Sequence, residues 1–456
     1  MTLFGWTAKL VTEALGLPAA TWDHAYTGLT TDTRAMQDGD LFVALKGERF
    51  DAHDFLGDAR LAGVGGVVVR HGTPRWPGFD WFEVDDTLVA LGQLARLRRE
   101  QFSGPVVAVT GTNGKTSTKE LIAAALGAKF TVHKSEKNLN NLVGVPLTVL
   151  AAPLEAGAMV VECGASVVGE IGRMRKIVRP DIAIVTNVGE GHLEGFGSRE
   201  AVLDEKSQLL VDAPIAIVGK TPAVLPETAQ RAAKKVVVAA TEAPAHWFAE
   251  SVTMSADGRP TFMVRGVKIE LPLYGRHMVA NALIALAAAD ACGVPLADAA
   301  MGLAKVALPG GRSETMEIEG VTVINDCYNA NPASLRAALD LLRDIRGKRR
   351  AIVVVGTMRE LGDASSALHR EAAKQVIDIG PDVVAAVGDF AEAFAVHTEY
   401  ARATKLLTGE NPEDVAAALR PLIKPGDVVL LKASRGVRLE RLLPLLWPSL
   451  QPAEAH

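Results

Sequence analysis

The sequence predicts an α/β protein of three domains: a central P-loop domain of the ATPase type with a parallel sheet, a smaller N-terminal α/β domain, and a C-terminal doubly wound α/β domain. The chain has 456 residues, more than one hydrophobic core usually organises. Apolar runs such as "VVAVTG" and "AMVVEC" lack alternation, as expected of parallel strands covered on both faces. Helical segments follow these runs, so strands and helices alternate along the chain.

We expect the three domains to span residues 1–100, 101–310 and 311–456. The first has short strands such as "GDLFVALKG" between helices and loops. It opens with "MTLFGWTAKLVTEALGL", which predicts a short amphipathic helix rather than a signal peptide. The third domain repeats the strand–helix rhythm in "VTVIND", "RRAIVVVG" and "DVVLLKASRG".

The second domain departs from this rhythm near its end. Residues 247–274 alternate in polarity and contain the turn signal Asp257-Gly258, so we expect antiparallel strands there. An alanine-rich helix follows and ends at Gly293. Proline and paired glycines mark residues 307–314 as the linker to the third domain, where we expect open and closed forms to hinge.

The composition argues against several classes of partner. The formal net charge is −5, which provides no basic surface for nucleic acid or for an anionic membrane. No run of 18 or more uncharged apolar residues occurs, so no membrane span is expected. The three cysteines, Cys163, Cys292 and Cys327, are scattered, which argues against a disulfide framework and fits a reducing compartment. We therefore expect a cytoplasmic protein, with a monomer as the default.

A glycine-rich turn, "GTNGKT", lies between a predicted strand and a predicted helix. Backbone N–H groups of such a turn, with the positive end of the helix, bind phosphate. Lys115 can meet the β- and γ-phosphates and the Thr116 hydroxyl can ligate Mg²⁺, although the loop is more compact than the usual one. A turn that merely joins strand to helix is the less favoured alternative. The residues expected to bind nucleotide here are Gly111, Thr112, Asn113, Gly114, Lys115, Thr116 and Ser117.

Polar residues follow other apolar strands of the same predicted sheet. In open α/β sheets ligands bind beyond the carboxyl ends of the strands, which is where Glu162 and His192 lie. Glu162 suits Mg²⁺ better than packing, although a solvated loop carboxylate is the alternative, as a surface histidine is for His192. The asparagine run that includes Asn138 can cap a helix or bind a polar ligand. Lys206, in "LDEKSQLL", has the pattern of an exposed helical lysine.

Several segments occur in the order that they have in one known family. They are "TGTNGKTST", "NLNNLVGVPLTVL", "ECGAS", "TNVGEGHLEGFGS", "GRHMVANALIALAAA", "GRSE", "NDCYNANPASLRAAL" and "KASRG". Together they resemble the Mur ligases, the ATP-dependent amide ligases that build the peptidoglycan stem peptide. The resemblance covers nearly the whole chain, and the phosphate loop of the family has the same compact spacing.

The resemblance implies a pair of substrates and a reaction. "YNANPASLRAAL" and "RELGDASSALHREAA" resemble the family member that joins D-alanyl-D-alanine (D-Ala-D-Ala) to UDP-N-acetylmuramoyl-tripeptide (UDP-MurNAc-tripeptide). In that reaction ATP phosphorylates the terminal carboxylate of the tripeptide, and the amine of D-Ala-D-Ala then attacks the acyl phosphate. The products are UDP-MurNAc-pentapeptide, ADP and phosphate, which implies a role in cell-wall biogenesis, cell shape and cell division.

The resemblance also implies roles for the strand-end residues. Lys115 would stabilise the transferred phosphoryl group, and Thr116 and Glu162 would hold a Mg²⁺ ion that bridges the phosphates. His192 and a carbamoylated Lys206 would hold a second Mg²⁺ near the acyl phosphate. Carbamoylation converts an ammonium group into a carboxylate-like ligand, which explains how a lysine could lie beside a metal. Lys115, His192 and Lys206 are therefore the expected catalytic residues.

Further contacts are implied in all three domains. Asn281 is expected at the adenine, Asp326 at the ribose, and Arg312 at the phosphates when the domains close. Thr357 stands where the family commonly has Asp, which makes an acidic role there doubtful. The candidates for substrate contacts are Thr33, Arg34 and Lys46 for the UDP-linked substrate, Asn138, and the group Tyr328, Asn329, Asn331, Lys432, Ser434 and Arg435 for D-Ala-D-Ala and the acyl phosphate. Solvated loop charges are the alternative for the first three, and a helix-start signal is the alternative for "NANPAS".

Three other functions compete with this interpretation. A folylpolyglutamate-type ligase shares the phosphate loop and the modified lysine, but the segment from Tyr328 to Ser334 and the N-terminal block argue against it. A P-loop ATPase or GTPase switch would hydrolyse nucleotide without an acceptor amine, and the sequence lacks the guanine-reading pattern Asn-Lys-x-Asp. A nucleotide-binding module without chemistry would not need Lys115, Thr116, Glu162 and His192 together.

Overall fold

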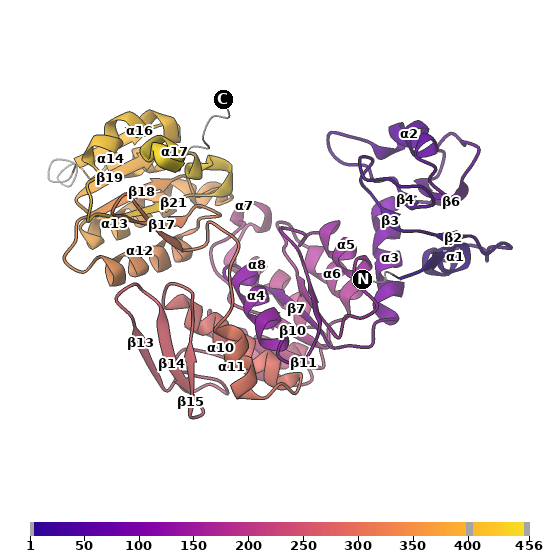
Figure 1. Ribbon diagram of the computed structural model, residues 1–456, viewed down its shortest axis with the longest axis horizontal. Helices are drawn as coiled ribbons and strands as arrows, with labels where there is room; N and C mark the ends of the chain where they lie inside the picture. Colours follow the sequence, from indigo (N-terminus) through magenta and orange to yellow (C-terminus); the bar gives the residue numbers. More distant parts are fainter. Residues whose placement is uncertain (1–3, 398–404, 451–456) are drawn as a thin grey trace.

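The computed structural model describes residues 4–397 and 405–450 and contains three domains arranged as a crescent (Figure 1). The central domain lies in the middle, with the N-terminal domain at one end and the C-terminal domain at the other. Each domain has its own main sheet, parallel or mainly parallel, which confirms the predicted α/β class.

The N-terminal domain is built on a four-stranded parallel sheet of order β3-β4-β5-β6. Its strands are β3 (Leu29–Thr30), β4 (Leu41–Val43), β5 (Gly66–Arg70) and β6 (Asp80–Val84). Two more strands, β1 (Trp6–Thr7) and β2 (Ala25–Tyr26), pair antiparallel, and α1 (Ala8–Leu15) between them confirms the predicted N-terminal helix. The other helices are η1 (Ala52–Phe55), α2 (Leu56–Leu61) and α3 (Thr87–Glu100).

The central domain has a six-stranded sheet in which every pair of neighbours is parallel. The order is β12-β11-β10-β7-β9-β8. The strands are β7 (Val106–Thr110), β8 (Val132–Lys134), β9 (Ala158–Glu162), β10 (Ile182–Val185), β11 (Ile215–Val218) and β12 (Val236–Val238).

Helices cover both faces of this sheet, which explains why its strands do not alternate in polarity. Val107 and Val109 pack with α4 (Lys115–Leu126) and α10 (His277–Ala291), whereas Val106 and Ala108 pack with residues of the opposite face. The other helices are α5 (Gly144–Leu150), α6 (Glu170–Val178), α7 (Leu193–Phe196), α8 (Arg199–Ser207), η2 (Gln208–Leu210), α9 (Leu225–Ala232) and α11 (Leu296–Leu303).

The predicted antiparallel insertion is confirmed. It consists of β13 (Ser251–Met254), β14 (Pro260–Val264) and β15 (Val267–Glu270), and Gly258 occupies the turn between the first two with φ of +87°. The helix predicted to end near Gly293 is α10. Residues 304–313, which include most of the expected linker, form no helix or strand.

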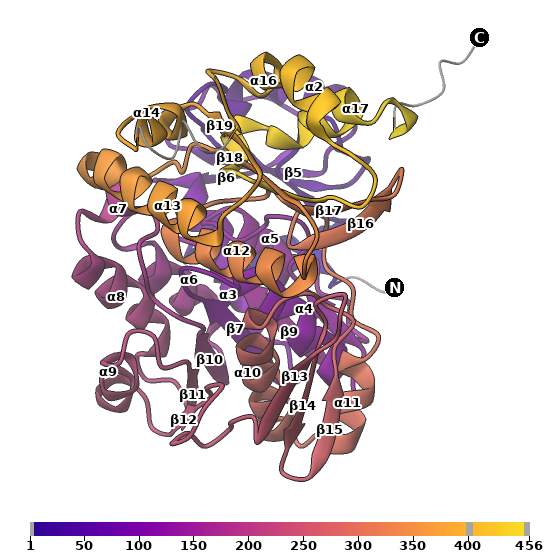
Figure 2. The ribbon, with the colours of Figure 1, turned by 90° about the vertical axis from the view of Figure 1, so that its left-hand side faces the viewer.

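The C-terminal domain has a six-stranded sheet of order β16-β17-β21-β18-β19-β20. Its strands are β16 (Glu314–Ile318), β17 (Val321–Asp326), β18 (Ala351–Gly356), β19 (Val383–Val387), β20 (Lys405–Gly409) and β21 (Val428–Lys432). The edge strand β16 is antiparallel to β17, so the sheet is mixed and differs at this edge from the doubly wound parallel pattern expected. Among the helices, α12 (Pro332–Arg346), α13 (Ser365–Ile379) and α14 (Asp389–Ala395) cover one face, and α16 (Pro412–Leu419) and α17 (Leu442–Leu446) cover the other. Figure 2 shows α12 on the side of this domain that faces the central domain.

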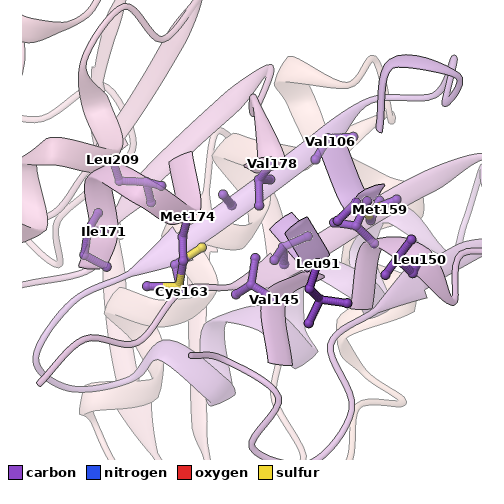
Figure 3. Close-up of a cluster of buried hydrophobic side chains, with 14 of the residues drawn as sticks. Leu91, Val106, Val145, Leu150, Met159, Cys163, Ile171, Met174, Val178 and Leu209 are labelled. Atoms are coloured by element: carbon purple, nitrogen blue, oxygen red, sulfur yellow. The ribbon is translucent and has the colours of Figure 1, made fainter. Parts of the chain in front are cut away.

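One hydrophobic cluster joins the N-terminal and central domains (Figure 3). Leu91 of α3 lies in it with Val106 and Met159 of the central sheet and Met174 of α6. Helix α3, which precedes the predicted boundary at residue 100, therefore belongs to a core that both domains share. No helix in the described part of the chain is long and apolar enough to cross a membrane.

We predict that Leu91→Ala lowers the free energy of unfolding by about 2–5 kcal/mol, because Leu91 is 0% exposed in this shared core. Val89→Ala, on the same helix, is the matched control. Val89 is 46% exposed, so we expect its replacement to change the same free energy by less than about 0.5 kcal/mol. Urea unfolding followed by circular dichroism measures both. Equal effects would contradict the role of α3 in the shared core.

Candidate active site

The carboxyl ends of three neighbouring strands of the central sheet meet at one edge. The register pairs Val185 of β10 with Thr110 of β7, and Glu162 of β9 with Val109. The phosphate loop, Glu162 and the segment that leads to His192 therefore start at the same level of the sheet. This is the edge at which ligands bind in open α/β sheets.

The phosphate loop requires glycine at both of its glycine positions. Gly111 and Gly114 have φ angles of +146° and +78°. A Cβ atom at Gly111 would lie 2.1 Å from Thr186 Oγ1, and one at Gly114 would lie 2.7 Å from Asn281 Oδ1. Gly114 is the N-cap of α4 and offers no side-chain cap, so the first N–H groups of the helix point at the loop without a capping partner.

Two residues after strand β10 hold the loop in place. Asn113 O accepts hydrogen bonds from Thr186 Oγ1 at 2.7 Å and from Asn187 Nδ2 at 3.0 Å, and Asn113 N donates to Asn187 Oδ1 at 3.0 Å. Thr112 N donates to Asn187 O at 2.9 Å. Thr186 and Asn187 are not among the residues predicted from the sequence, although their position directly after the apolar run "IAIV" is a signal that identifies them.

Lys115, the first residue of α4, lies over the loop that precedes it. Its Nζ donates to Gly111 O at 2.8 Å and to Thr112 O at 3.2 Å. Burial lowers the pKa of Lys115, the Glu162 carboxylate opposes this shift, and Arg312 adds to it. The ammonium group thus lies against the phosphate loop, bonded to two of its carbonyl oxygens.

Glu162 is buried, with one carboxylate oxygen bonded and the other free of hydrogen bonds among the described residues. Oε1 accepts from Asn140 Nδ2 at 2.9 Å, and Oε2 is the atom without a partner. The backbone N–H of Glu162 donates to Ser135 Oγ at 3.0 Å, which fixes the strand end. A buried, unpartnered carboxylate oxygen is costly without a cation, so this oxygen suits a metal ion.

The interpretation of Lys206 as an exposed lysine, based on the pattern alone, is wrong. The residue is 0% exposed, its Nζ donates to Ala165 O at 3.1 Å, and the same nitrogen lies 5.3 Å from the centre of the Phe196 ring. The adjacent Glu205 carboxylate accepts from the backbone N–H groups of Gly169 and Ile171. Burial, reinforced by repulsion from Lys115, lowers the pKa of Lys206 to about 7.

His192 precedes α7 and lies at the boundary with the C-terminal domain. It adopts a left-handed conformation with φ of +57°. Its Nδ1 lies 2.6 Å from Oε2 of Glu360, a residue of the C-terminal domain that the sequence analysis does not select. The His192 contact is the main cause that lowers the pKa of Glu360. Figures 1 and 2 show α7 beside the C-terminal domain.

Two further contacts join the phosphate loop and its helix to residues beyond the central domain. Arg312 Nη2 donates to Thr116 Oγ1 at 3.1 Å, and the guanidinium carbon lies 3.5 Å from the centre of the Tyr328 ring. Asn113 and Asn331 exchange two amide hydrogen bonds of 3.2 and 2.7 Å. The structure thus brings both Arg312 and Asn331 to the phosphate loop.

Two family models match the chain. One describes the Mur ligase middle domain and matches residues 109–289, and the other describes the Mur ligase glutamate ligase domain and matches residues 311–435. The chain belongs to the Mur ligase family. The resemblance inferred from its motifs is therefore confirmed, and the protein is an ATP-dependent ligase of the EC 6.3.2 type.

The similarity to individual Mur ligases extends over the whole chain. UDP-N-acetylmuramoyl-tripeptide–D-alanyl-D-alanine ligase of Bacillus subtilis is 36% identical over 431 residues, which cover 91% of this chain and 92% of that protein. A crystal structure of MurF from Acinetobacter baumannii matches with a TM-score of 0.88 and 31% identity, covering 98% of this chain and 99% of that one. MurF from Thermotoga maritima, solved in complex with ADP, gives a TM-score of 0.81 and 29% identity, covering 92% and 96%.

Most of the expected C-terminal site residues of this Mur ligase bond within their own domain. Lys432 Nζ lies 2.7 Å from Asp326 Oδ2 and donates to Asn329 O at 2.6 Å. Ser434 is buried and its Oγ accepts from Arg359 N at 2.9 Å. The exposed Arg435 pairs with Glu440, and Asn329 is also exposed. Contacts of these residues with substrate stay predictions, as do the proposed domain limits.

The remaining candidates lie in loops or on the surface. In the N-terminal domain Arg34 is exposed and pairs with Asp32, and Lys46 is exposed and lies 3.5 Å from Asp51. Thr33 adjoins Arg34 and is half-buried, and Asn138 is exposed. Ser117 and Asn281 are buried beside the phosphate loop, on α4 and α10. Thr357, at the position where an acidic role is doubtful, accepts from Asp389 N through its hydroxyl at 3.0 Å.

We predict that Gly114→Ala weakens ATP binding by at least about tenfold without unfolding the protein. The substitution puts a Cβ atom 2.7 Å from Asn281 Oδ1. It also puts a non-glycine residue at φ of +78°, a backbone conformation that costs about 1–3 kcal/mol. Gly172→Ala is the control, because its Cβ would have no neighbour closer than 4.0 Å in helix α6. Titration calorimetry measures the affinities, and equal ATP affinities of the two variants would refute the packing argument.

Proposed function

We propose that this Mur ligase joins D-Ala-D-Ala to UDP-MurNAc-tripeptide and forms UDP-MurNAc-pentapeptide, ADP and phosphate. The observation that carries the proposal is the full-length similarity to proteins of that activity, which includes the compact phosphate loop. The product is a precursor of peptidoglycan. ATP as a substrate fits a cytoplasmic location, and a monomeric state stays our expectation.

The residues of the site suit the activation of a carboxylate. A carboxylate is a poor electrophile, and phosphorylation by ATP would give it a good leaving group. Because the phosphate and the carboxylate are both anions, their approach needs positive charge. Lys115 and the first N–H groups of α4 face the loop, and Arg312 lies next to Thr116, which supports the proposal that these groups supply the charge.

Thr116 and the free Oε2 of Glu162 fit a Mg²⁺ ion, which prefers oxygen ligands. Within the described residues no three His, Cys, Asp or Glu side chains form a metal cluster. This agrees with a site in which phosphate oxygens and water complete the coordination, as is usual for Mg²⁺ in phosphoryl-transfer enzymes. When bound, Mg²⁺ would neutralise charge on the transferred phosphoryl group.

Lys206 and His192 would hold the second Mg²⁺ if Lys206 is carbamoylated. In that reaction the neutral amine attacks CO₂, a nitrogen–carbon bond forms, and the amine loses a proton to give the carbamate anion. The reaction needs the unprotonated amine, and burial that lowers the pKa of Lys206 to about 7 provides it near neutral pH. The carbamate would give this site an anionic oxygen ligand.

The N- and C-terminal domains would supply the two substrates to this edge. Thr33, Arg34 and Lys46 remain our candidates for the UDP-linked substrate, and the exposed state of Arg34 and Lys46 leaves them accessible. For D-Ala-D-Ala, Asn329 and Arg435 are the exposed members of the C-terminal group.

We predict that phosphate release from Mg·ATP requires both UDP-MurNAc-tripeptide and D-Ala-D-Ala, and that mass spectrometry detects the pentapeptide product. Lys115→Ala should lower kcat by about 10²–10³ or more, because it removes a cation from the transferred phosphoryl group. The exposed Lys176→Ala serves as the control and should retain activity. Phosphate release that ignores both co-substrates would instead support an ATPase switch.

We also predict that ¹³C-bicarbonate labels Lys206 as a carbamate. Because the folded-state pKa of the amine is lowered to about 7, the reactive neutral form dominates above pH 7 and is lost as the pH falls below it. The carbamate signal in a ¹³C NMR spectrum should therefore weaken between pH 8 and pH 6. It should disappear in Lys206→Gln and persist in Lys176→Ala. A spectrum without a Lys206-dependent carbamate signal at pH 8 would refute the modification.

A further inference from the structure

The contact between His192 and Glu360 places a carboxylate against a histidine that we expect to ligate a metal. His192 Nδ1 lies 2.6 Å from Glu360 Oε2. Nδ1 is buried, and no residue of the described chain gives it a hydrogen bond of good geometry. Glu360 is thus the group placed to receive its proton, and the contact crosses from the central to the C-terminal domain.

The backbone around Glu360 holds this carboxylate at the domain boundary. Glu360 O accepts a hydrogen bond from Glu194 N at 3.2 Å, so the main chains of the two domains are joined next to the side-chain contact. Gly362 packs so closely on Glu194 that a Cβ atom there would lie 3.2 Å from Glu194 Cα. The close approach of η3 (Gly362–Ala364) to α7 therefore fixes the distance between Glu360 and His192.

The start of this loop is anchored in the C-terminal domain itself. Met358 N donates to Nε2 of the buried His369 at 2.9 Å, and His369 Nδ1 contacts Ser365 O at 2.8 Å. Arg359 N donates to Ser434 Oγ at 2.9 Å. Two backbone N–H groups directly before Glu360 are thus tied to the body of the domain, so Glu360 moves with that domain.

An imidazole can bind a metal through one nitrogen only if the other carries the proton. In metal sites that second N–H usually donates to a carboxylate, which fixes the tautomer and the orientation of the ring. The His192–Glu360 pair has the spacing of this arrangement, because Nδ1 lies 2.6 Å from the carboxylate oxygen, although its angle is not that of a formed hydrogen bond. Nε2 is the nitrogen that would remain for a cation.

We propose that Glu360 is a positioning residue that holds His192 as the Nδ1–H tautomer and thereby presents Nε2 to the second Mg²⁺. The inference rests on the proposed function for the metal at His192. It has a consequence for the reaction: the metal site of the central domain is complete only while the C-terminal domain is docked. An ordinary ion pair between domains is the alternative, and it would not control the tautomer.

The tautomer can be measured directly in the full-length protein labelled with ¹⁵N-histidine. Long-range ¹H–¹⁵N NMR distinguishes Nδ1–H from Nε2–H, and the signal that disappears in His192→Asn identifies His192. We expect the Nδ1–H form in the wild type and in Glu360→Gln, whose amide oxygen can still accept. We expect a mixture of tautomers in Glu360→Ala.

Glu194→Gln is the matched control, because it removes a charge from the same interface without a side-chain contact to His192. Its tautomer should match that of the wild type. An Nε2–H form in the wild type, or an unchanged tautomer in Glu360→Ala, would overturn the proposal.

Metal affinity provides the second test. Electron paramagnetic resonance measures Mn²⁺ binding in the presence of a non-hydrolysable ATP analogue. Glu360→Ala should lower the affinity for one of the bound Mn²⁺ ions by about 10- to 100-fold. In a His192→Asn background, Glu360→Ala should cause no further loss of Mn²⁺ affinity, because Glu360 acts through His192. An equal loss in both backgrounds, or no loss in the wild-type background, would overturn the inference alone. If His192→Asn itself leaves all Mn²⁺ binding unchanged, the metal assignment of the proposed function fails as well.

Discussion

The site depends on the burial of positive charge at one edge of the central sheet. Besides burial, repulsion from Lys115 lowers the pKa of Lys206, and repulsion from Arg312 lowers the pKa of Lys115, so each positive charge makes its neighbour more costly. Burial of an ion costs several kcal/mol unless an opposite charge offsets it. The structure limits this cost by lowering the pKa of Lys206, by placing Glu162 near Lys115, and by stacking Arg312 on Tyr328. A triphosphate supplies the missing negative charge, so the same arrangement that costs stability favours the ligand.

Among the described residues, three side-chain contacts join the C-terminal domain and the linker that leads to it to this edge. Arg312 meets Thr116, Asn331 meets Asn113, and Glu360 meets His192. In each case the partner in the central domain is a residue that we expect to bind nucleotide or metal. A ligand that makes or breaks these contacts therefore changes the free energy of domain docking. Docking then changes the free energy of ligand binding by the same amount.

Local signals made the framework of the site predictable, and tertiary packing decided the rest. Strand and loop patterns were sufficient for the phosphate loop and for Glu162 at a strand end. The burial of Lys206 was missed although its helical spacing from the buried Val202, Leu209 and Leu210 indicates an inward face. The cover from Phe196 and Ala165 was not predictable, because it comes from other segments. Glu360 was missed because its partner lies 168 positions earlier in the sequence, in another domain. The antiparallel direction of β16 was also missed, although the two-residue loop Glu319-Gly320 that joins it to β17 is a hairpin turn with positive φ at both residues.

The packing also indicates which domain is free to move. The N-terminal domain shares a buried apolar cluster with the central domain through α1 and α3, so their separation would expose core residues such as Leu91. The two cores of the C-terminal domain are separate from those of the other domains. Tyr274 of the central domain packs on one of them, and Leu341 and Ile345 of α12 lie against Gly258. Interfaces made mainly of polar contacts permit relative motion of domains. The linker without regular structure at residues 304–313 precedes that polar interface, so motion of the C-terminal domain would make or break the contacts at the phosphate loop while the N-terminal domain stays in place.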